Sequence, residues 1–405
     1  MPTLEQRVLT ELLAEEISGK SNLSEEELKT ADWEEVLKEA KAQAVPIMAA
    51  ESAVKYKEYI KNFKDWELTA AKLHTYNFRV CLEEQKLNKI MQGNPFCILK
   101  GMSAASYYKN PKDRCLGDID FLVNCREQDK AEELLLKNGY QNLNIDNEHH
   151  VTFNKTGVHL EMHFEIPGIP NGKAGETVRE YVKNLLDNTH TAKFNNYTFP
   201  APDDIYHGLI ILLHMQHHMI DEGIGLRHIC DWACYVNKTQ NEPFWQELLE
   251  LYKKIGILTY AKVITKISSM YFHIDCPEWA NGADEQLCED VIKDVLKGGN
   301  FGRKDKLRSK SSLMIAKNEY TTSKISKVSN LLWILHRSVI TNYPIVKKLP
   351  VLYPFFYCYR GVLYAFRMFA GKRASVFKMA PMAKERKSVY ERLHLFEIEG
   401  NRENL

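Results

Sequence analysis

The spacing of hydrophobic positions divides the chain into helical segments on either side of a shorter segment with a different period. From Leu4 to about Tyr59, and again from about Asp65 to Met91, apolar residues recur at the intervals of an amphipathic helix. Ser24 precedes Glu27 at the spacing of a capping box, and the breakers Gly93-Asn94-Pro95 end the second pattern. The pattern therefore predicts a helical N-terminal region.

After Pro95 the apolar runs become short and alternate with polar residues, which is typical of strands. The predicted elements are a strand at 96–99, a helix from Ser103, a strand at 118–123, a helix at 131–137, and a hairpin of 150–153 with 158–166. From Asp203 onward the helical period returns, at His207–Met219, Arg227–Val236 and Phe244–Ile255. We expect an α+β protein in which a small mixed-sheet core is flanked by N-terminal and C-terminal helical regions.

Length and composition agree with a folded protein of several domains. The chain has 405 residues, 44% of them hydrophobic and 26% charged, which is the profile of a soluble globular protein. At roughly 100–200 residues per domain, two or three domains are expected. We place the N-terminal helical region, the mixed core, a second helical region and a basic helical C-terminal region at 1–93, 94–200, 201–300 and 301–405.

Charge is nearly balanced in total but segregated along the chain. Residues 1–290 carry 31 basic and 45 acidic side chains, whereas residues 291–390 carry 21 basic and 4 acidic ones. A one-signed segment of that size attracts phosphate, nucleic acid or an anionic membrane surface. The alternative is that the basic segment folds onto the acidic body, and the sequence leaves both arrangements open.

Several features indicate a cytoplasmic protein. No stretch approaches the roughly 20 apolar residues of a membrane-spanning helix, and acidic residues stand where a signal peptide would be basic. The nine cysteines include no Cys-x-x-Cys pair, and Cys230 and Cys234 are spaced for adjacent helical turns. We therefore expect reduced thiols and no zinc knuckle.

Three carboxylates are candidates for a metal site. Asp118 and Asp120 lie two residues apart on a predicted strand, so both project from one face, where a cation must offset their repulsion. Glu161 would become the third ligand if the sheet brings its strand alongside. Such a set suits Mg²⁺, with Mn²⁺ as the alternative ion. An isolated Asp-x-Asp is more often a surface strand, but the order of the surrounding elements favours the site.

A strand, a glycine turn and a helix precede the aspartates and offer the groups that a triphosphate needs. Lys100 supplies positive charge, Gly101 permits close approach of the backbone, and Ser103 offers a hydroxyl at the predicted helix start. The simpler interpretation of Gly-x-Ser alone is a helix cap. The aspartates and the glutamate that follow favour a phosphate-binding turn.

Three segments carry a family resemblance. They are Leu99–Ala105, Arg114–Val123 and Val158–His163, with Tyr107-Tyr108 between the first two. Together they resemble the uncharacterised bacterial nucleotidyltransferases of the DNA polymerase β-like superfamily. That superfamily has Gly-Ser or Gly-Gly at a helix start, then Asp-x-Asp, then a third carboxylate on a later strand. The resemblance covers about residues 30–240 and implies the same mixed-sheet core.

The resemblance implies a Mg²⁺-dependent transfer of NMP from an NTP to an unidentified small-molecule or protein acceptor, with release of pyrophosphate. Asp118, Asp120 and Glu161 would be catalytic metal ligands, and the phosphates would be bound by Lys100, Gly101, Ser103 and Arg114. Arg114 matches an arginine four residues before the first aspartate in related antibiotic nucleotidyltransferases; the alternative is a solvated loop charge. Met102 stands directly after the glycine, where the superfamily usually has Gly or Ser.

Polar residues of the second helical region are candidates for the acceptor side. His214 and His218 are one helical turn apart and spaced to chelate one ion, although we favour histidines that line a cleft or are buried with partners. Arg227 and Asp231 would form an i, i+4 pair or face the acceptor. The resemblance places their helix near the active site, and the acceptor-side candidates are His163, His214, Arg227 and Asp231.

Aromatic and basic residues interleave over 326–370. They predict either a helical core packed on the rest of the chain or a peripheral surface in which aromatics meet anionic lipid. A second hypothesis therefore stands beside the enzyme. In it, a catalytically silent module senses a nucleoside triphosphate and engages nucleic acid or an anionic membrane through residues 291–390. Nucleotide binding without pyrophosphate release would favour the sensor.

Overall fold

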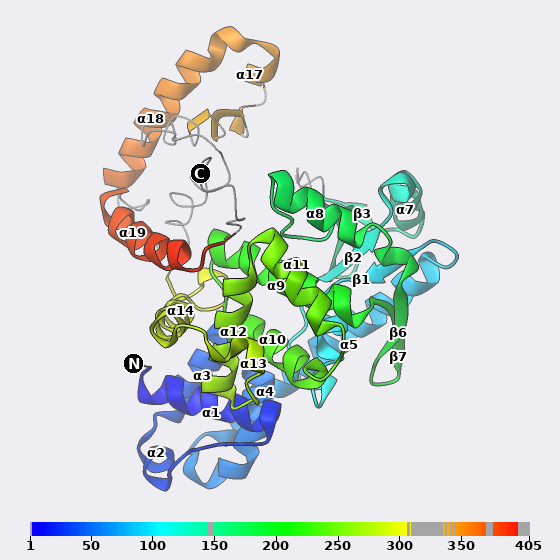
Figure 1. Cartoon of the computed structure of the whole chain (residues 1–405). Helices are drawn as coiled ribbons and strands as arrows, with labels where there is room; N and C mark the ends of the chain where they lie inside the picture. Colours follow the sequence, from blue (N-terminus) through cyan, green and yellow to red (C-terminus); the bar gives the residue numbers. More distant parts are fainter. Residues whose placement is uncertain are drawn as a thin grey trace.

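The chain folds as the α+β protein predicted from its sequence, with a mixed five-stranded sheet, a two-stranded sheet and helices on both flanks (Figure 1). The computed structural model describes residues 2–143, 150–305, 308, 335–336, 338–340, 342–343, 345–369 and 376–395. The nine cysteines are free thiols.

The N-terminal helices form where the sequence provides caps and apolar stripes. They are α1 (Leu4–Ser18), α2 (Glu25–Thr30), α3 (Trp33–Ala42), α4 (Pro46–Ala53) and α5 (Phe63–Ile90), with a 3₁₀ turn at Val54–Tyr59. The predicted capping box of Ser24 and Glu27 starts α2. The long helix α5 ends just before Gly93, which adopts a φ of +81° that favours glycine. The helical N-terminal region is confirmed.

The five-stranded sheet has the order β1-β2-β5-β4-β3, in which β2 and β5 run parallel and the other neighbours antiparallel. In chain order the strands β1 to β5 are Phe96–Ile98, Ile119–Val123, Gln141–Asn142, His150–Asn154 and His159–His163. The register of the parallel pair places Asp120 opposite Glu161. Two strands distant in sequence thus carry carboxylates side by side.

Shorter elements surround the sheet. They are α6 (Met102–Ala105), α7 (Gln128–Lys137), α8 (Gly172–Val182), the hairpin of β6 (Thr189–Phe194) and β7 (Tyr197–Pro202), and 3₁₀ turns at Pro111–Asp113, Cys125–Glu127 and Leu185–Asp187. The β6–β7 hairpin is absent from the sequence prediction. Its turn contains Asn195 at φ +53° followed by Asn196, and an Asn-Asn pair between alternating residues is the signal that could have revealed it.

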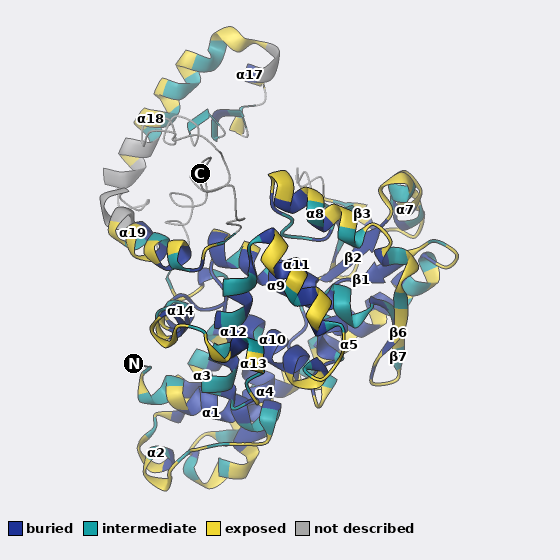
Figure 2. Cartoon of the chain, viewed as in Figure 1, coloured by how far each residue is buried: buried dark blue, intermediate teal, exposed yellow. Residues whose placement is uncertain are grey.

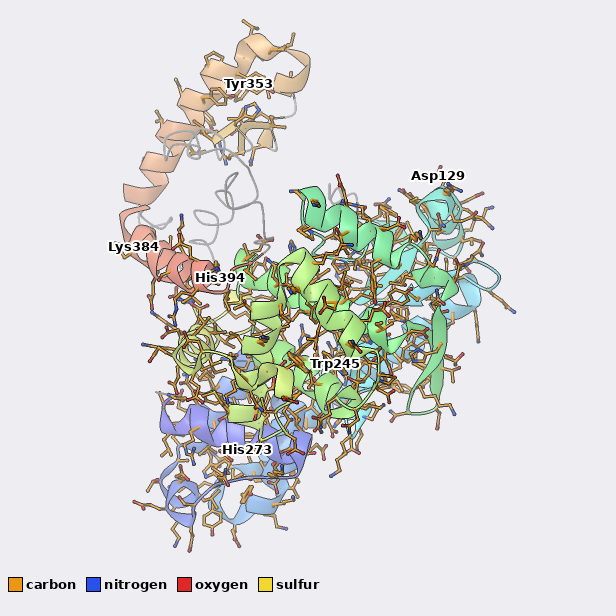
Figure 3. All side chains as sticks on the ribbon, in the orientation of Figure 1. Asp129, Trp245, His273, Tyr353, Lys384 and His394 are labelled. Atoms are coloured by element: carbon orange, nitrogen blue, oxygen red, sulfur yellow. The ribbon has the colours of Figure 1, made fainter. Side chains whose placement is uncertain are left out.

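A helical region follows the sheet and shares a hydrophobic core with the N-terminal helices. It comprises α9 (Asp204–Asp221), α10 (Leu226–Thr239), α11 (Trp245–Ile255), α12 (Leu258–Phe272), α13 (Glu278–Asn281), α14 (Glu285–Gly298) and a 3₁₀ turn at Asn300–Gly302. α1 packs against α10 and α12. At the end of α12, His273 Nε2 lies 3.0 Å from a carboxylate oxygen of Glu11 (Figure 3). The chain segments on both sides of the sheet therefore form one helical body.

The described C-terminal helices are α17 (Ile345–Lys348), α18 (Tyr353–Phe369) and α19 (Val376–Arg392), with a 3₁₀ turn at Pro350–Leu352. α19 packs on α14, where Arg392 Nη1 lies 2.5 Å from Asp290 Oδ2. Part of the basic segment therefore folds onto the acidic body. α18 extends away from that body and exposes much of its surface (Figures 1 and 2).

The aromatic-rich segment is only partly described, and residues 326–334 lie outside the described residues. Within the described residues, no helix combines the length and the apolar character needed to cross a bilayer.

Two neighbouring tyrosines attach the sheet to the helical region. Tyr107 donates its hydroxyl hydrogen bond to Asp204 Oδ1 at 2.6 Å, and Tyr108 donates to Asp231 Oδ1 at 2.6 Å. Asp204 begins α9 and Asp231 lies in α10. The two helices are therefore fixed against the turn that follows β1.

Asn77 of α5 positions the loop that leads into β2. Its amide nitrogen donates to the backbone oxygens of Arg114 at 2.8 Å and Lys112 at 3.3 Å, and its Oδ1 accepts from the Leu116 amide at 2.9 Å. Asn77 is buried, so these backbone groups have no access to water as an alternative partner. A single side chain thus determines where the strand that carries Asp120 begins.

We expect Asn77→Ala to lower the free energy of unfolding by roughly 2–4 kcal/mol, because it leaves a buried carbonyl and a buried amide unpaired. Urea denaturation would measure the loss. Asn62→Ala is the matched control, since Asn62 is exposed and makes no capping hydrogen bond. Equal stability of both variants would show that the loop does not depend on Asn77.

Candidate active site

Three carboxylates meet where β2 and β5 lie side by side. Asp118 is exposed and precedes β2, Asp120 is buried on β2, and Glu161 is partly buried on β5. One oxygen of each lies within 4.8 Å of the others. The two-residue spacing places both aspartates on one face, and the parallel register adds the glutamate. The structure thus brings together the three residues that the sequence predicts as metal ligands.

Two donors hold Asp120 in its ionised form. Lys100 Nζ lies 2.7 Å from Asp120 Oδ1, and His163 Nε2 lies 2.9 Å from the same oxygen. Burial by itself would raise the pKa of Asp120, but the charge of Lys100 and the hydrogen bond from His163 more than offset it and hold this pKa below its usual range. The buried carboxylate is therefore negatively charged at neutral pH.

Histidines surround Glu161. His163 Nε2 lies 3.7 Å and His150 Nε2 lies 3.8 Å from Glu161 Oε2. Burial opposes protonation of His163, yet its hydrogen bond with Asp120 and the nearby carboxylate of Glu161 raise its pKa. His150, Glu161 and His163 form a second group that could hold an ion, with ligand atoms within 4.8 Å. The sequence analysis missed His150, because only the strand pairing brings β4 beside β5.

The predicted phosphate turn lies beside the carboxylates. Gly101 adopts a φ of +66°, and a Cβ there would lie 3.7 Å from the backbone oxygen of Asp118. Ser103 is buried and its Oγ donates to the Ile98 backbone oxygen at 2.5 Å. The hydroxyl therefore stabilises the turn from strand to helix, and α6 continues for only four residues. A phosphate-binding role for this turn stays a prediction.

Arg114 is buried and pairs with Asp231. Its Nε and Nη2 each lie 2.8 Å from a different oxygen of that carboxylate, and Tyr108 donates to it as well. The attraction of Asp231 outweighs the burial cost and raises the pKa of Arg114. Arg114 is thus not a solvated loop charge, and its role in binding phosphate stays a prediction. Asp231 takes it as a partner in place of Arg227, the partner expected from i, i+4 spacing.

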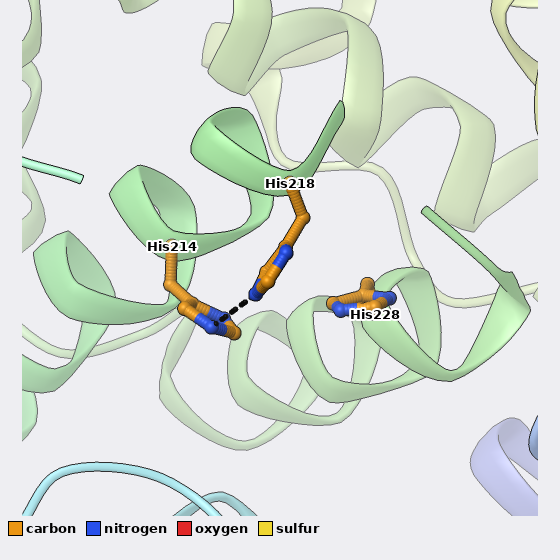
Figure 4. Close-up of side chains that lie close together, drawn as sticks. All are labelled: His214, His218 and His228. Carbon is orange, nitrogen blue, oxygen red and sulfur yellow. Dashed lines mark hydrogen bonds between the residues drawn. The ribbon is translucent and has the colours of Figure 1, made fainter. Parts of the chain in front are cut away.

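Three histidines of the helical region lie close together (Figure 4). His214 and His218 of α9 and His228 of α10 each bring a ring nitrogen within 4.8 Å of the others. The two Nε2 atoms of His214 and His218 are 2.7 Å apart, and Lys100 Nζ lies 2.7 Å from His214 Nε2. Burial, with the positive charges nearby, lowers the pKa of all three histidines well below 6.5.

Lys100 therefore connects the two clusters, since it contacts Asp120 on one side and His214 on the other. The sequence predicted the nearness of His214 and His218 but missed His228. The available signal for His228 was its position directly after the predicted site residue Arg227, at the start of α10. His207, on the same predicted face as His214, is instead buried with its Nδ1 3.0 Å from the Tyr107 hydroxyl, and burial lowers its pKa to about 4.

The arrangement defines a class of protein. Two aspartates at the start of one strand, a glutamate on the parallel neighbour and a preceding strand–glycine–helix turn form the core expected of a nucleotidyltransferase. Residues 29–273 match a family described as uncharacterised nucleotidyltransferase, and the chain belongs to that family. No curated protein and no solved structure matches the chain.

The pairing of Arg114 with Asp231 generates a stability prediction. Arg114→Met or Asp231→Leu alone should cost about 3–5 kcal/mol, because each leaves an uncompensated buried charge. The double variant should cost clearly less than the sum of the two. Thermal unfolding of the four proteins would measure this coupling. Additive costs would mean that the two side chains do not depend on each other.

Proposed function

We propose that the protein is a Mg²⁺-dependent nucleotidyltransferase that transfers a nucleoside monophosphate from a nucleoside triphosphate to an acceptor. The meeting of Asp118, Asp120 and Glu161, in a chain of the nucleotidyltransferase family, carries the proposal. An acceptor oxygen would form a bond to the α-phosphorus, the bond from that phosphorus to the oxygen bridging to the β-phosphorus would break, and pyrophosphate would leave. The predicted cytoplasmic location would supply the triphosphate.

The donor set fits Mg²⁺, which prefers carboxylate oxygens and retains positions for water and phosphate. Lys100 and His163 both contact Oδ1 of Asp120, and no described residue hydrogen-bonds its Oδ2. That oxygen, with Asp118 and Glu161, would hold the ion; Mn²⁺ is the alternative. When bound, the ion would offset negative charge on the phosphates.

The chain's own residues would position the reactants. Lys100 and His163 both contact Oδ1 of Asp120. These two contacts fix the orientation of the carboxylate and therefore the position of its second oxygen, Oδ2. Glu161 would complete the ligand set or accept the proton of an acceptor hydroxyl. The acceptor, a small molecule or a protein hydroxyl, would approach from α9 and α10, because these helices face the site through Lys100 and His214.

Asp118→Asn and Asp120→Asn should each abolish metal-dependent nucleotide binding with the fold intact, because each removes a carboxylate ligand. Calorimetric titration of each of the four nucleoside triphosphates, with and without Mg²⁺, would measure binding. Asp129→Asn is the matched control, since Asp129 is exposed on α7 (Figure 3).

Unchanged metal-dependent binding by Asp118→Asn and Asp120→Asn would contradict the proposal. Binding by the wild type that never leads to pyrophosphate release, across an acceptor screen, would favour the nucleotide-sensing module instead. Loss of binding in both variants, together with release by the wild type, would support the enzyme.

A second candidate function rests on α18. Its inner aromatics are packed, since Phe356 stacks on Tyr343 with ring centroids 4.4 Å apart. The opposite side of α18 exposes a stripe of large apolar residues, Phe355, Tyr359, Val362 and Phe366, and exposed Val351 precedes it in the 3₁₀ turn. Exposed apolar stripes of this kind mark membrane or partner surfaces. We propose that α18 binds an anionic membrane, to which the basic segment 291–390 is attracted.

Phe355→Glu and Phe366→Glu should each weaken binding to vesicles that contain phosphatidylglycerol by tenfold or more, because a carboxylate replaces a buried apolar contact and is repelled by the lipid. Co-sedimentation of the full chain with these vesicles would measure the binding. Phe78→Glu is the matched control, since Phe78 is exposed on α5. Salt-sensitive binding to RNA with no vesicle binding would instead assign the segment to nucleic acid.

A further inference from the structure

A small cavity lies between α6, α9 and α10, on the far side of Lys100 from the carboxylates. We call it the cationic chamber, and its polar lining consists of Lys100, Arg114, His214, Arg227, His228 and Asp231. Two of its cations are neutralised, because Asp120 contacts Lys100 and Asp231 binds Arg114. Arg227 is the one left over within the described residues.

Arg227 is a charge without a partner. Its guanidinium makes no hydrogen bond or ion pair with any described residue, and its Nε is sealed from solvent. Its recorded side-chain neighbour is the ring of Phe301, 5.8 Å from the guanidinium carbon. Burial and the charge of Arg114 lower the pKa of Arg227, while Asp231 and Asp118 act in the opposite direction. Arg227 as a whole is only half-buried, but a sealed N–H without an acceptor is costly in a folded protein, so a ligand that completes it is expected.

His228 supplies a second unpaired donor. The backbone amide of Gly225 donates to its Nδ1 at 3.3 Å, so a neutral ring carries its hydrogen on Nε2. Nε2 is buried and has no hydrogen-bond partner among the described residues. The Nε–H of Arg227 and the Nε2–H of His228 therefore belong to residues that line the same chamber. Neither N–H group has an acceptor oxygen among the described residues.

The histidine hydrogen bonds argue against a metal ion in the chamber. The Lys100 ammonium can only donate, so the single lone pair of His214 Nε2 accepts from it. The lone pair of His214 is thus occupied and Nε2 of His228 bears a hydrogen, so in this arrangement neither nitrogen is available as a metal ligand. The groups present suit an anion.

A strained loop packs against two of the histidines beside the chamber. Phe301 has a φ of +54°, between Gly299 at +69° and Gly302 at +62°. Its ring lies 4.8 Å from that of His218 and 5.5 Å from that of His228. A non-glycine residue in this backbone conformation is uncommon and occurs often at binding sites. The loop lies outside residues 29–273, the part of the chain that matches the family.

We propose that the cationic chamber binds a phosphoryl group of a substrate, with the Nε–H of Arg227 and the Nε2–H of His228 as donors. The proposal rests on the proposed function, because it assigns the group to a reactant. A phosphoryl group suits the chamber because its several oxygens accept from separate donors, and arginine binds it well. The group would come from the triphosphate of the nucleotide or from a phosphate-bearing acceptor.

Calorimetric titration of pyrophosphate into the metal-free protein would test the proposal. We expect Arg227→Met to weaken binding by about ten- to a hundredfold, the value of a charge-assisted hydrogen bond. Its melting temperature should stay the same or rise, because the substitution removes an uncompensated charge, whereas loss of a structural arginine would lower it. Arg79→Met, an exposed change on α5, should bind as the wild type does and controls for the loss of one positive charge.

A second pair of variants tests the histidine donor. His228→Gln keeps an amide N–H near the position of Nε2 and should retain most of the affinity, whereas His228→Leu removes the donor and should lose it. Pyrophosphate binding by Arg227→Met equal to that of the wild type would overturn the proposal. So would a wild type that fails to bind pyrophosphate.

Two further experiments identify the source of the phosphoryl group. They also distinguish a failure of this proposal from a failure of the proposed function. Competition between pyrophosphate and Mg²⁺–nucleotide would assign the chamber to the triphosphate, and additive binding would assign it to the acceptor; either result supports the chamber. Asp118→Asn should still bind pyrophosphate without metal while it loses metal-dependent nucleotide binding. If the wild type binds pyrophosphate through Arg227 but never transfers a nucleotide, the proposed reaction fails and the anion site stands.

Discussion

The parallel pairing of β2 with β5 is the constraint on which the candidate site depends. It joins a strand from the start of the core to one some forty residues later, with Asp120 opposite Glu161. Because side chains alternate along a strand, a slip of one residue would turn the carboxylates to the opposite face of the sheet. The apolar residues of β2, all buried, resist such a slip, since they would lose their places in the core. Packing of the sheet therefore determines the geometry of the acidic cluster.

Close carboxylates repel one another, and the structure compensates them with cations from several elements. Lys100 follows β1, and His163 ends β5. In the low dielectric of the interior such contacts are strong, so Asp120 stays ionised despite its burial. The same lysine reaches His214 of α9, which couples the acidic cluster to the neutral histidines. One side chain therefore connects the sheet to the helical region.

The helical region does more than cover the sheet. Tyr107 and Tyr108 fasten it to the turn after β1, and the buried pair of Arg114 with Asp231 fastens it to the loop before β2. Because Arg114 pairs with Asp231, Arg227 is the cation of the chamber that has no acidic partner among the described residues. The two arginines therefore have different roles. Arg114 stabilises the contact between the sheet and the helical region, and Arg227 is available to a ligand.

Local sequence patterns determined the helices, the β4–β5 hairpin and the two-residue spacing of Asp118 and Asp120, because these depend on near neighbours and on a period of 3.6 or 2. The nearness of Glu161 was predicted only on condition that the strands pair. The partner of Arg114, the approach of His228 to His214 and the place of Phe301 were decided by tertiary structure. Each joins residues from different elements, and their meeting is set by packing over distances that no local pattern encodes. The sequence thus supplied the chemistry, and long-range packing decided which groups satisfy one another.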